Sequence, residues 1–272
     1  MKVYVSSYLS RSISILDYST LEFERDIKLD ENIYPHNFCI DNRQQLAYIP
    51  SSLDGELYVL DLSIGKIIDN ISIGGKLTNI ALCNEELFIS NEDSNSIYIL
   101  DVKTSNPIGV IGVDNMPHGF DIDSINNRLY VACINSIICI DTISKSICKK
   151  KEIYTSTLDG KVVVIDEESL KIIKIIDEFL LPVQICFNYE AKKIYVADMG
   201  YKKVMILDYD TGKVLDYINI DGDPQGIQIS NDYKLLFISD TKNNLIKVYN
   251  TSDNTLIKNI EVGKEPTTIL CM

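Results

Sequence analysis

The sequence lacks any long apolar run, and no stretch approaches the roughly 18 consecutive apolar residues that a membrane-spanning helix needs. Its first residues, MKVYVSSYLSRSISILD, alternate like a strand and contain neither the apolar core nor the cleavage site of a secretion signal. Basic residues are few, 26 against 39 acidic ones, which gives a net charge of −13. Since such a surface repels phosphate backbones, we expect no nucleic acid as partner, and the lack of a spanning run argues against a membrane.

Catalytic motifs are also missing, because the chain has no Gly-rich phosphate loop and no nucleophile elbow. The seven cysteines are an odd number, and most lie inside apolar runs such as NFCID and VQICF. Scattered thiols of this kind favour small core residues over a disulfide framework. We therefore expect a cytoplasmic protein in a reducing setting, without a bound metal or other cofactor.

One sequence repeat occurs twice near the end of the chain. IYVADMGYKKVMILDYDTGKVLDYINIDGDP, which ends at Pro224, returns 42 residues later as LFISDTKNNLIKVYNTSDNTLIKNIEVGKEP, which ends at Pro266. Each copy contains three short alternating apolar runs, and its final Pro opens a fourth. A unit of about 40 residues with four strands is typical of a β-propeller blade.

Two columns of residues extend this unit over the whole chain. An aromatic residue occurs in the first run of each unit, at Tyr4, Tyr48, Phe88, Tyr130, Tyr154, Tyr195 and Phe237. An acid or amide closes the second run, at Asp17, Asp61, Asp101, Asp141, Asp166, Asp208 and Asn250. The spacings are 40 to 44 residues, except for one short step of 24 or 25 residues. Both columns predict seven units in a single domain of residues 1–272, with the closing acids serving hairpin turns rather than catalysis.

Prolines mark the most apolar run of five units, at Pro35, Pro117, Pro182, Pro224 and Pro266. Proline suits the first residue of a strand, where no ladder donor is needed. We name this run A and the next three B, C and D, so the chain begins with a B run and ends with an A run. The last A run, residues 266–272, can then pair with the first B run and close the ring.

The fifth unit departs from this order. About 16 residues are lacking between Asp141 and Asp166, and no Pro-led run occurs between Phe120 and Leu181. The fifth blade is therefore expected to be irregular or to lack its inner strand. Either residues 142–152 cross over as a loop or a segment is missing from the chain as given.

The units resemble the YVTN family of β-propeller repeats, within the seven-bladed YncE-like and lactonase-like proteins. The similarity lies in the YV-containing B runs, the VxVID-like C runs and the TGKV-like turn, and DYDTGKVLDYINIDGDPQGIQIS matches it best. WD40 repeats are disfavoured because the chain has no tryptophan, and kelch repeats because it has no suitable Gly pair. The resemblance implies an all-β, seven-bladed propeller and leaves the activity open, since similar propellers are binding platforms and enzymes.

A binding site is expected where the D–A and B–C loops meet on one face at the mouth of the central channel. The only two histidines, His36 and His118, both follow the Pro that opens an A run. The same face is predicted to hold Arg11, Asp54, Asp198, Tyr201, Gln225, Asp240 and Thr267. Two histidines could bind a transition metal or share acid–base work, but they are fewer than the three or four ligands of a zinc site. Asn91 to Asn95 could bind calcium, or could simply form a solvated turn.

Two functions fit these observations. The first is a monomeric, non-enzymatic binding platform that presents its loop face to an unidentified protein, peptide or small molecule. The alternative is a lactonase- or lyase-type enzyme that uses the channel-mouth histidines, and metal-assisted chemistry is one version of it. A third possibility, an exported surface protein, is disfavoured by the lack of a recognisable signal.

Overall fold

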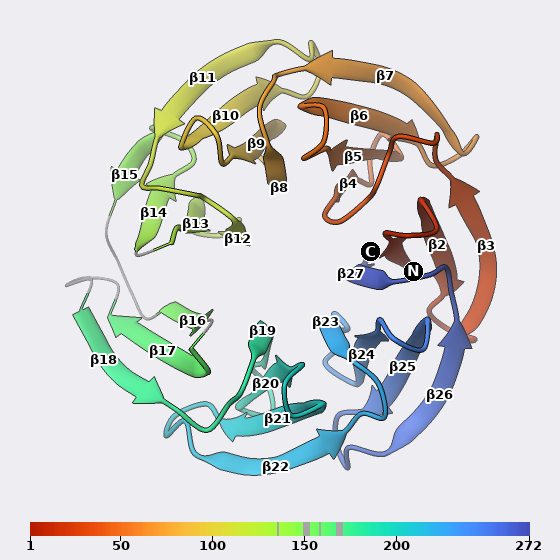
Figure 1. Ribbon diagram of the computed structural model, residues 1–272, viewed down its shortest axis with the longest axis vertical. Coiled ribbons are helices and arrows are strands. Elements are labelled where there is room, and N and C mark those ends of the chain that lie inside the picture. Colours follow the sequence, from red (N-terminus) through yellow and green to blue (C-terminus); the bar gives the residue numbers. More distant parts are fainter. Residues whose placement is uncertain (135, 149–152, 158, 167–170) are drawn as a thin grey trace. The chain divides into compact units, whose positions relative to one another are not determined.

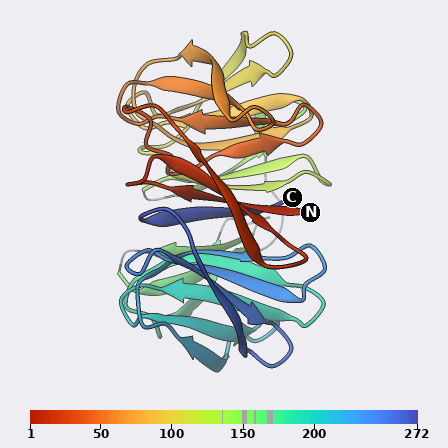
Figure 2. The same cartoon turned by 90° about the vertical axis from the view of Figure 1, so that its right-hand side faces the viewer.

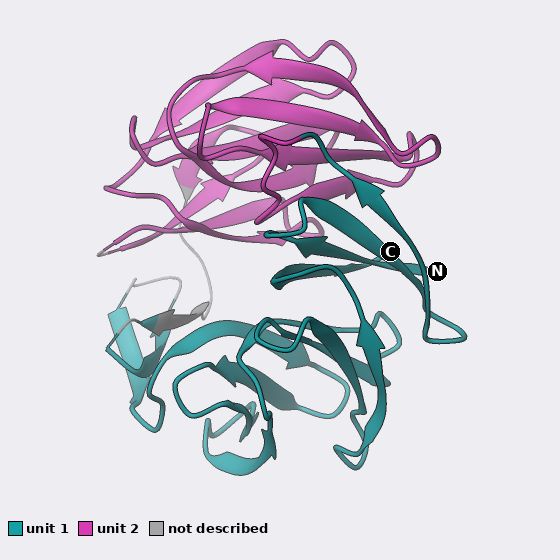
Figure 3. Ribbon diagram, turned by 45° about the vertical axis from the view of Figure 1, so that its right-hand side comes forward, with its two compact units in different colours: residues 1–30, 151–272 teal, residues 31–150 magenta. Residues whose placement is uncertain are grey.

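The computed structural model describes residues 1–134, 136–148, 153–157, 159–166 and 171–272, and all regular elements within them are β-strands. The chain forms two compact units (Figure 3). Unit 1 comprises residues 1–30 and 151–272, and unit 2 comprises residues 31–150. The strands form separate antiparallel sheets in which neighbours in sequence are neighbours in space (Figure 1). The all-β prediction is therefore confirmed for the described residues.

Unit 1 contains four sheets. Sheet 1 has the order β27–β1–β2–β3, with β1 at Lys2–Ser7, β2 at Ser12–Asp17, β3 at Glu22–Lys28 and β27 at Pro266–Cys271. Sheet 5 has three strands, β16 (Ile153–Thr157), β17 (Lys161–Asp166) and β18 (Lys171–Ile176). Sheet 6 contains β19 (Pro182–Asn188), β20 (Lys193–Asp198), β21 (Lys203–Asp208) and β22 (Val214–Asn219). Sheet 7 contains β23 (Pro224–Ile229), β24 (Leu235–Asp240), β25 (Leu245–Asn250) and β26 (Leu256–Glu261).

Unit 2 contains the other three sheets. Sheet 2 contains β4 (Cys39–Asp41), β5 (Leu46–Pro50), β6 (Glu56–Asp61) and β7 (Lys66–Ser72). Sheet 3 contains β8 (Leu77–Cys83), β9 (Glu86–Asn91), β10 (Ser96–Asp101) and β11 (Pro107–Gly112). Sheet 4 contains β12 (Gly119–Asp123), β13 (Arg128–Ala132), β14 (Ile137–Asp141) and β15 (Ser146–Cys148).

The two ends of the chain complete sheet 1, as predicted. Val3 pairs with Cys271 and Val5 with Ile269 in an antiparallel ladder. The amide of Lys2 donates to the carbonyl of Met272 at 2.8 Å, and the termini lie side by side in both views (Figures 1 and 2). A strand from the far end of the chain therefore serves as the inner strand of the first sheet.

Among the described residues, six sheets are four-stranded blades and one sheet has three strands, so six complete blades are seen where seven blades with an irregular fifth were predicted. Within the described residues, sheet 5 has no strand in the A position, which agrees with the predicted loss of an inner strand. The alternative of a loop over residues 142–152 is wrong for its first part, because Ile147 of β15 pairs with Ile140 of β14. The turn after Asp141 reverses the chain into β15, which is only three residues long. The rest of the predicted loop, residues 149–152, lies outside the described residues.

The sequence columns explain the local structure. Oδ1 of the residue that closes the C strand accepts the backbone amide three residues later, or two residues later at Asn250, and this forms each hairpin turn. These bonds are seen at Asp17, Asp61, Asp101, Asp141, Asp208 and Asn250, which confirms the turn prediction for six of the seven positions. Five residues of the aromatic column are buried, namely Tyr4, Tyr48, Phe88, Tyr195 and Phe237, whereas Tyr130 is partly buried.

Prolines begin the inner strands of unit 1 but not those of unit 2. Strands β19, β23 and β27 start at Pro182, Pro224 and Pro266. In unit 2, β4 starts at Cys39 and β12 at Gly119, each after the Pro-His pair. His36 and His118 therefore lie in loops just before their strands.

Candidate functional site

The residue that ends the B strand fastens the loops on the predicted binding face. The buried carboxylate of Asp198 accepts the amides of Leu180 and Tyr201 at 2.8 and 3.0 Å. Asp240, also fully buried, accepts the amides of Asp223 and Asn243 at 3.2 Å. These carboxylates therefore join the D–A loop to the B–C turn of their own sheet.

A buried cation supports Asp240. Nζ of Lys247 lies 3.5 Å from Oδ2 of Asp240 and 2.5 Å from Oδ1 of the exposed Asp221. Burial tends to lower the pKa of Lys247, but the hydrogen bond and charge of Asp221 outweigh it, and the pKa is raised. The three residues form a structural ion network in unit 1.

The other predicted residues of unit 1 occupy turns and inner strands. Thr267 is buried in β27, where its hydroxyl lies 2.8 Å from that of Ser6. Gln225 is half-buried in β23, and Tyr201 is exposed in the β20–β21 turn. Arg11 has a positive φ of 49° in the β1–β2 turn. A role of these side chains in binding stays a prediction.

In unit 2, three charged or polar residues meet where β8 and β12 begin. Nδ1 of His118 donates to Oε1 of Glu92 at 2.5 Å, and the amine of Lys76 contacts the other carboxylate oxygen. The Glu92 side chain is only 4% exposed, whereas those of His118 and Lys76 are 65% and 45% exposed. We call these three residues the Glu92 cluster.

The backbone holds the Glu92 cluster in place. The amide of Glu92 donates to the carbonyl of Lys76 at 2.9 Å, and that of His118 donates to Ala132 at 2.9 Å. Burial alone would raise the pKa of Glu92, but the hydrogen bonds from Lys76 and His118 outweigh it and lower the pKa. Glu92 is thus a buried anion held between two exposed cationic or polar groups.

His36 lies within electrostatic reach of this cluster. Much of its surface is open, yet protein surrounds the ring closely enough for desolvation to lower its pKa, and the charge of His118 lowers it further. The Asn37 side-chain amide lies 3.3 Å from Nδ1 of His36 and donates to the carbonyl of Thr78 at 3.1 Å. Asp54, the remaining predicted residue of unit 2, accepts the Tyr58 hydroxyl at 2.6 Å within its own turn.

The cluster is suited to hydrogen bonding and proton transfer. Because Glu92 engages Nδ1 of His118, the neutral ring presents Nε2 as an exposed acceptor. The described residues contain no group of three or more His, Cys, Asp or Glu side chains arranged to hold a metal ion. In the proposed calcium segment, Asn91 donates to Gly74 and Asn95 accepts from Met116, so both amides already fasten loops.

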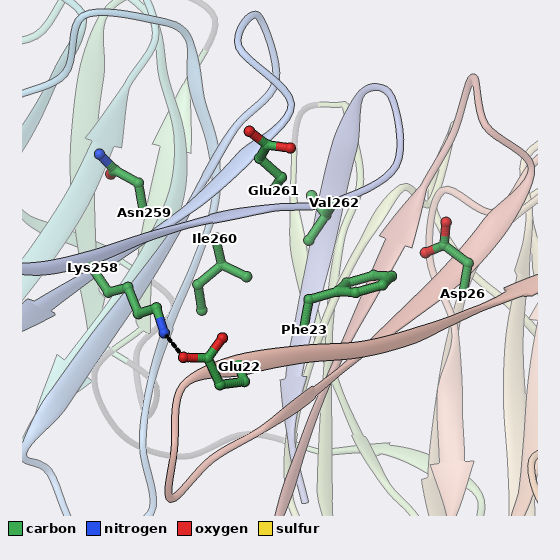
Figure 4. A pocket seen from close by; sticks show the side chains of 8 residues that line it. All are labelled: Glu22, Phe23, Asp26, Lys258, Asn259, Ile260, Glu261 and Val262. Atoms are coloured by element: carbon green, nitrogen blue, oxygen red, sulfur yellow. Dashed lines mark hydrogen bonds and ion pairs between the residues drawn. The ribbon is translucent and has the colours of Figure 1, made fainter.

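A separate pocket lies on the outside of unit 1, between β3 and β26 (Figure 4). It is shallow, has a volume of about 420 Å³, and contains the exposed ring of Phe23. Lys258 reaches across it to form an ion pair with Glu22. None of the residues predicted for binding lines it, so the pocket and the predicted site are different surfaces.

Sequence reasoning placed Glu92 on the correct loop but did not connect it with His118, and it missed Lys76. The relevant signal is that Lys76 precedes the A run of sheet 3, Glu92 lies in the B–C turn of the same sheet, and His118 precedes β12 of sheet 4. A contact between adjacent sheets depends on how far each loop extends, which the repeat alone does not specify.

Comparisons with known proteins support the fold. No family model matches the chain. It is 24% identical over 272 residues to Antigen Lp49 of Leptospira interrogans serogroup Icterohaemorrhagiae serovar copenhageni (strain Fiocruz L1-130). That match covers 91% of this chain and 54% of the relative, so the chain spans about half the length of the curated protein it matches.

Solved structures give the same result. Kuenenia stuttgartiensis hydrazine synthase matches with a TM-score of 0.74 and 16% identity, over 88% of this chain and 90% of that one. Dihydro-heme d1 dehydrogenase NirN in complex with DHE matches with a TM-score of 0.75 and 13% identity, over 99% of this chain and 74% of that one. The computationally designed Ika8 protein matches with a TM-score of 0.72 and 13% identity, over 97% of this chain and 86% of that one. At these identities the likeness shows the fold alone, and that fold is a β-propeller. The described residues include no helix that is long and apolar enough to cross a membrane.

Proposed function

We propose that this β-propeller is a non-enzymatic binding platform whose loop face takes a protein, peptide or small molecule. The observation that supports it is the use of the loop carboxylates: Asp54, Asp198 and Asp240 each accept a backbone amide two or three residues later, from Glu56, Tyr201 and Asn243. These bonds stabilise the loops of each unit, and in unit 2 the exposed side chains of His118 and Lys76 can contact a partner. A rigid polar surface of this kind is suited to recognition.

A second candidate is a lactonase- or lyase-type enzyme, and the 2.5 Å bond between His118 and Glu92 favours it. A carboxylate that fixes the orientation of an imidazole is the arrangement of a positioned general base. In that function, Nε2 of His118 would take a proton from water or from a carbon next to a carbonyl group. Glu92 would stabilise the imidazolium that forms.

A turnover assay on a panel of lactones and sugar lactones separates the two candidates. The platform predicts no hydrolysis by wild-type protein above the buffer rate. Hydrolysis that is lost in both His118→Ala and Glu92→Gln, but kept in Lys192→Ala, would replace the platform with the enzyme. Lys192 is a matched control because it is exposed in unit 1 and forms an ion pair with the exposed Asp210, away from the Glu92 cluster in the sequence.

The finer classification belongs to the same proposal. We propose a seven-bladed, monomeric, cytoplasmic propeller of the YVTN type, with sheet 5 as the incomplete blade. The repeat spacing supports the blade count, and six described cysteines with free thiols support a reducing compartment. Counting blades in averaged electron micrographs tests the first point. Recovery of the protein outside the cell would contradict the compartment.

A further inference from the structure

Sheet 5 leaves one strand edge of unit 1 without a partner among the described residues. In the other sheets of unit 1, the strand equivalent to β16 pairs on both sides: β1 with β27 and β2, β20 with β19 and β21, and β24 with β23 and β25. Among the described residues, strand β16 pairs with β17 alone, from Ile153↔Ile165 to Thr157↔Lys161. The backbone on its other side is therefore available for a further strand.

The alternation of the strand identifies the groups at this edge. The carbonyl of Thr157 accepts the amide of Gly160 and so faces the β17 side. Tyr154 and Ser156 alternate with it and direct their N–H and C=O groups to the open side. In sheet 1, Lys2 lies two residues before Tyr4, the equivalent of Tyr154, so it faces the same side; its N–H and C=O groups bond to Met272, next to the inner strand β27.

A second observation comes from β19, the inner strand of the next sheet. Ile185 and Phe187 of β19 pack against the core on the sheet 5 side but remain partly exposed. Their equivalents in β23, Ile227 and Ile229, are 1% and 5% exposed. In β27 the equivalent Ile269 is 3% exposed. The inner strand that would cover Ile185 and Phe187 is the one that sheet 5 does not have within the described part of the chain.

We propose that the edge of β16 is a binding site for an extended peptide segment of another polypeptide, which adds as the inner strand of sheet 5. The inner strands of unit 1 define its chemistry. They are six or seven residues long, begin with Pro, carry no charge and are apolar at alternate positions, as in PQGIQI and PTTILC. Main-chain hydrogen bonds to Tyr154 and Ser156 would hold the peptide on β16, and apolar contact with Ile185 would fix the register in which the peptide pairs with β16.

The protein already uses this kind of assembly. Strand β27 completes sheet 1 without a hairpin to β1, because the two strands are at opposite ends of the chain. Its residues Ile269 and Cys271 pack in the same core as Val3 and Val5. A free peptide that completes sheet 5 would repeat that arrangement between two molecules.

The test is fluorescence anisotropy with a labelled peptide of residues 266–272, in which Cys271 is replaced by Val. We expect saturable binding with one peptide per protein molecule. Two further peptides serve as a matched pair. In β27 the amide of Met272 bonds to β1, so by alternation Leu270 faces β1 and Ile269 faces away. N-methylation at the Leu270 position should weaken binding at least tenfold, whereas N-methylation at the Ile269 position should change it less than threefold.

Protein variants locate the site. Ile185→Asn should weaken peptide binding at least fivefold, while Val183→Asn, which alters the side of β19 that packs toward sheet 7, should leave it within twofold. Thermal unfolding of both variants checks that they fold. Hydrogen exchange should show new protection of the amides of Tyr154 and Ser156 when the peptide is bound.

Three results would overturn the proposal. One is no binding at peptide concentrations up to about 1 mM, and another is equal binding of the two N-methylated peptides. The third is full protection of the Tyr154 and Ser156 amides in the free protein, because the edge would then already be covered.

Discussion

Lys247 is the clearest case of a single residue whose charge the fold requires. Its side chain is 6% exposed and its amine lies between Asp221 and the fully buried Asp240. Lys247→Met would leave Asp240 as a buried charge without its cation. We expect a loss of roughly 3 kcal/mol in the free energy of unfolding, measured by urea titration with far-UV circular dichroism. Adding Asp240→Asn to Lys247→Met should recover part of the lost stability, because the buried charge is then removed. If Lys247→Met alone costs less than about 1 kcal/mol, the loop amides are sufficient to stabilise the Asp240 carboxylate without the lysine.

His36 predicts a specific pH dependence of stability. Its folded-state pKa lies below its ordinary value of 6.5, because of desolvation and the charge of His118. Between these two pKa values the unfolded chain binds more protons than the folded chain, so stability decreases as pH falls below about 6.5 and levels off below the folded pKa. Melting temperatures from pH 8 to pH 5 should show this decrease, and His36→Gln should flatten it. An unchanged slope in the variant would assign the effect to another group.

At the scale of a turn, Asp198 acts as a fastener between β20 and the loop before β19. It accepts the amides of Leu180, Leu181 and Tyr201. Asp198→Ala should cost roughly 2 to 4 kcal/mol in unfolding free energy, since these partly buried amides lose their acceptor. Asp198→Asn keeps one oxygen acceptor and should cost less. If both variants are as stable as wild type, water replaces the carboxylate and the fastening role is wrong.

The inner strands β23 and β27 approach each other closely at Gly226. A Cβ atom added there would lie 1.9 Å from the carbonyl oxygen of Thr267, so β23 or β27 would have to move. Gly226→Ala should therefore destabilise the protein by about 1 to 3 kcal/mol. Gly112→Ala is the matched control, because its Cβ would meet no atom within 4 Å and its effect should be near zero. Similar melting temperatures for the two variants would contradict the close approach.

Sequence patterns predicted the strands well because each strand repeats a local rule. The aromatic column and the closing Asp column both follow from packing and turn chemistry within one unit, and they correctly placed Phe237 and Asp208. The short strand β15 was missed because the expected loop over residues 142–152 left no place for a strand of three residues. The bond between His118 and Glu92 was missed because it joins two sheets, and no period in the sequence encodes the reach of a loop across that interface.

For the chain as a whole, the joining of its two ends is the feature with the largest expected effect. Strand β27 supplies Ile269 and Cys271 to the core that contains Val3, and it covers the edge of β1. A chain that ends at Glu265 should lose several kcal/mol of stability, because it loses this apolar contact and exposes a second unpaired strand edge. Thermal unfolding and size-exclusion chromatography should show a lower melting temperature and self-association.

The same truncation distinguishes the two strand edges of unit 1. Adding the peptide of residues 266–272 to the truncated chain should restore the melting temperature, since the peptide can take the place of β27 beside β1. If the edge of β16 also accepts a strand, the truncated chain should bind two peptides where the full chain binds one. One peptide on the truncated chain and none on the full chain would confine strand addition to β1, because sheet 5 would then be stable without its inner strand.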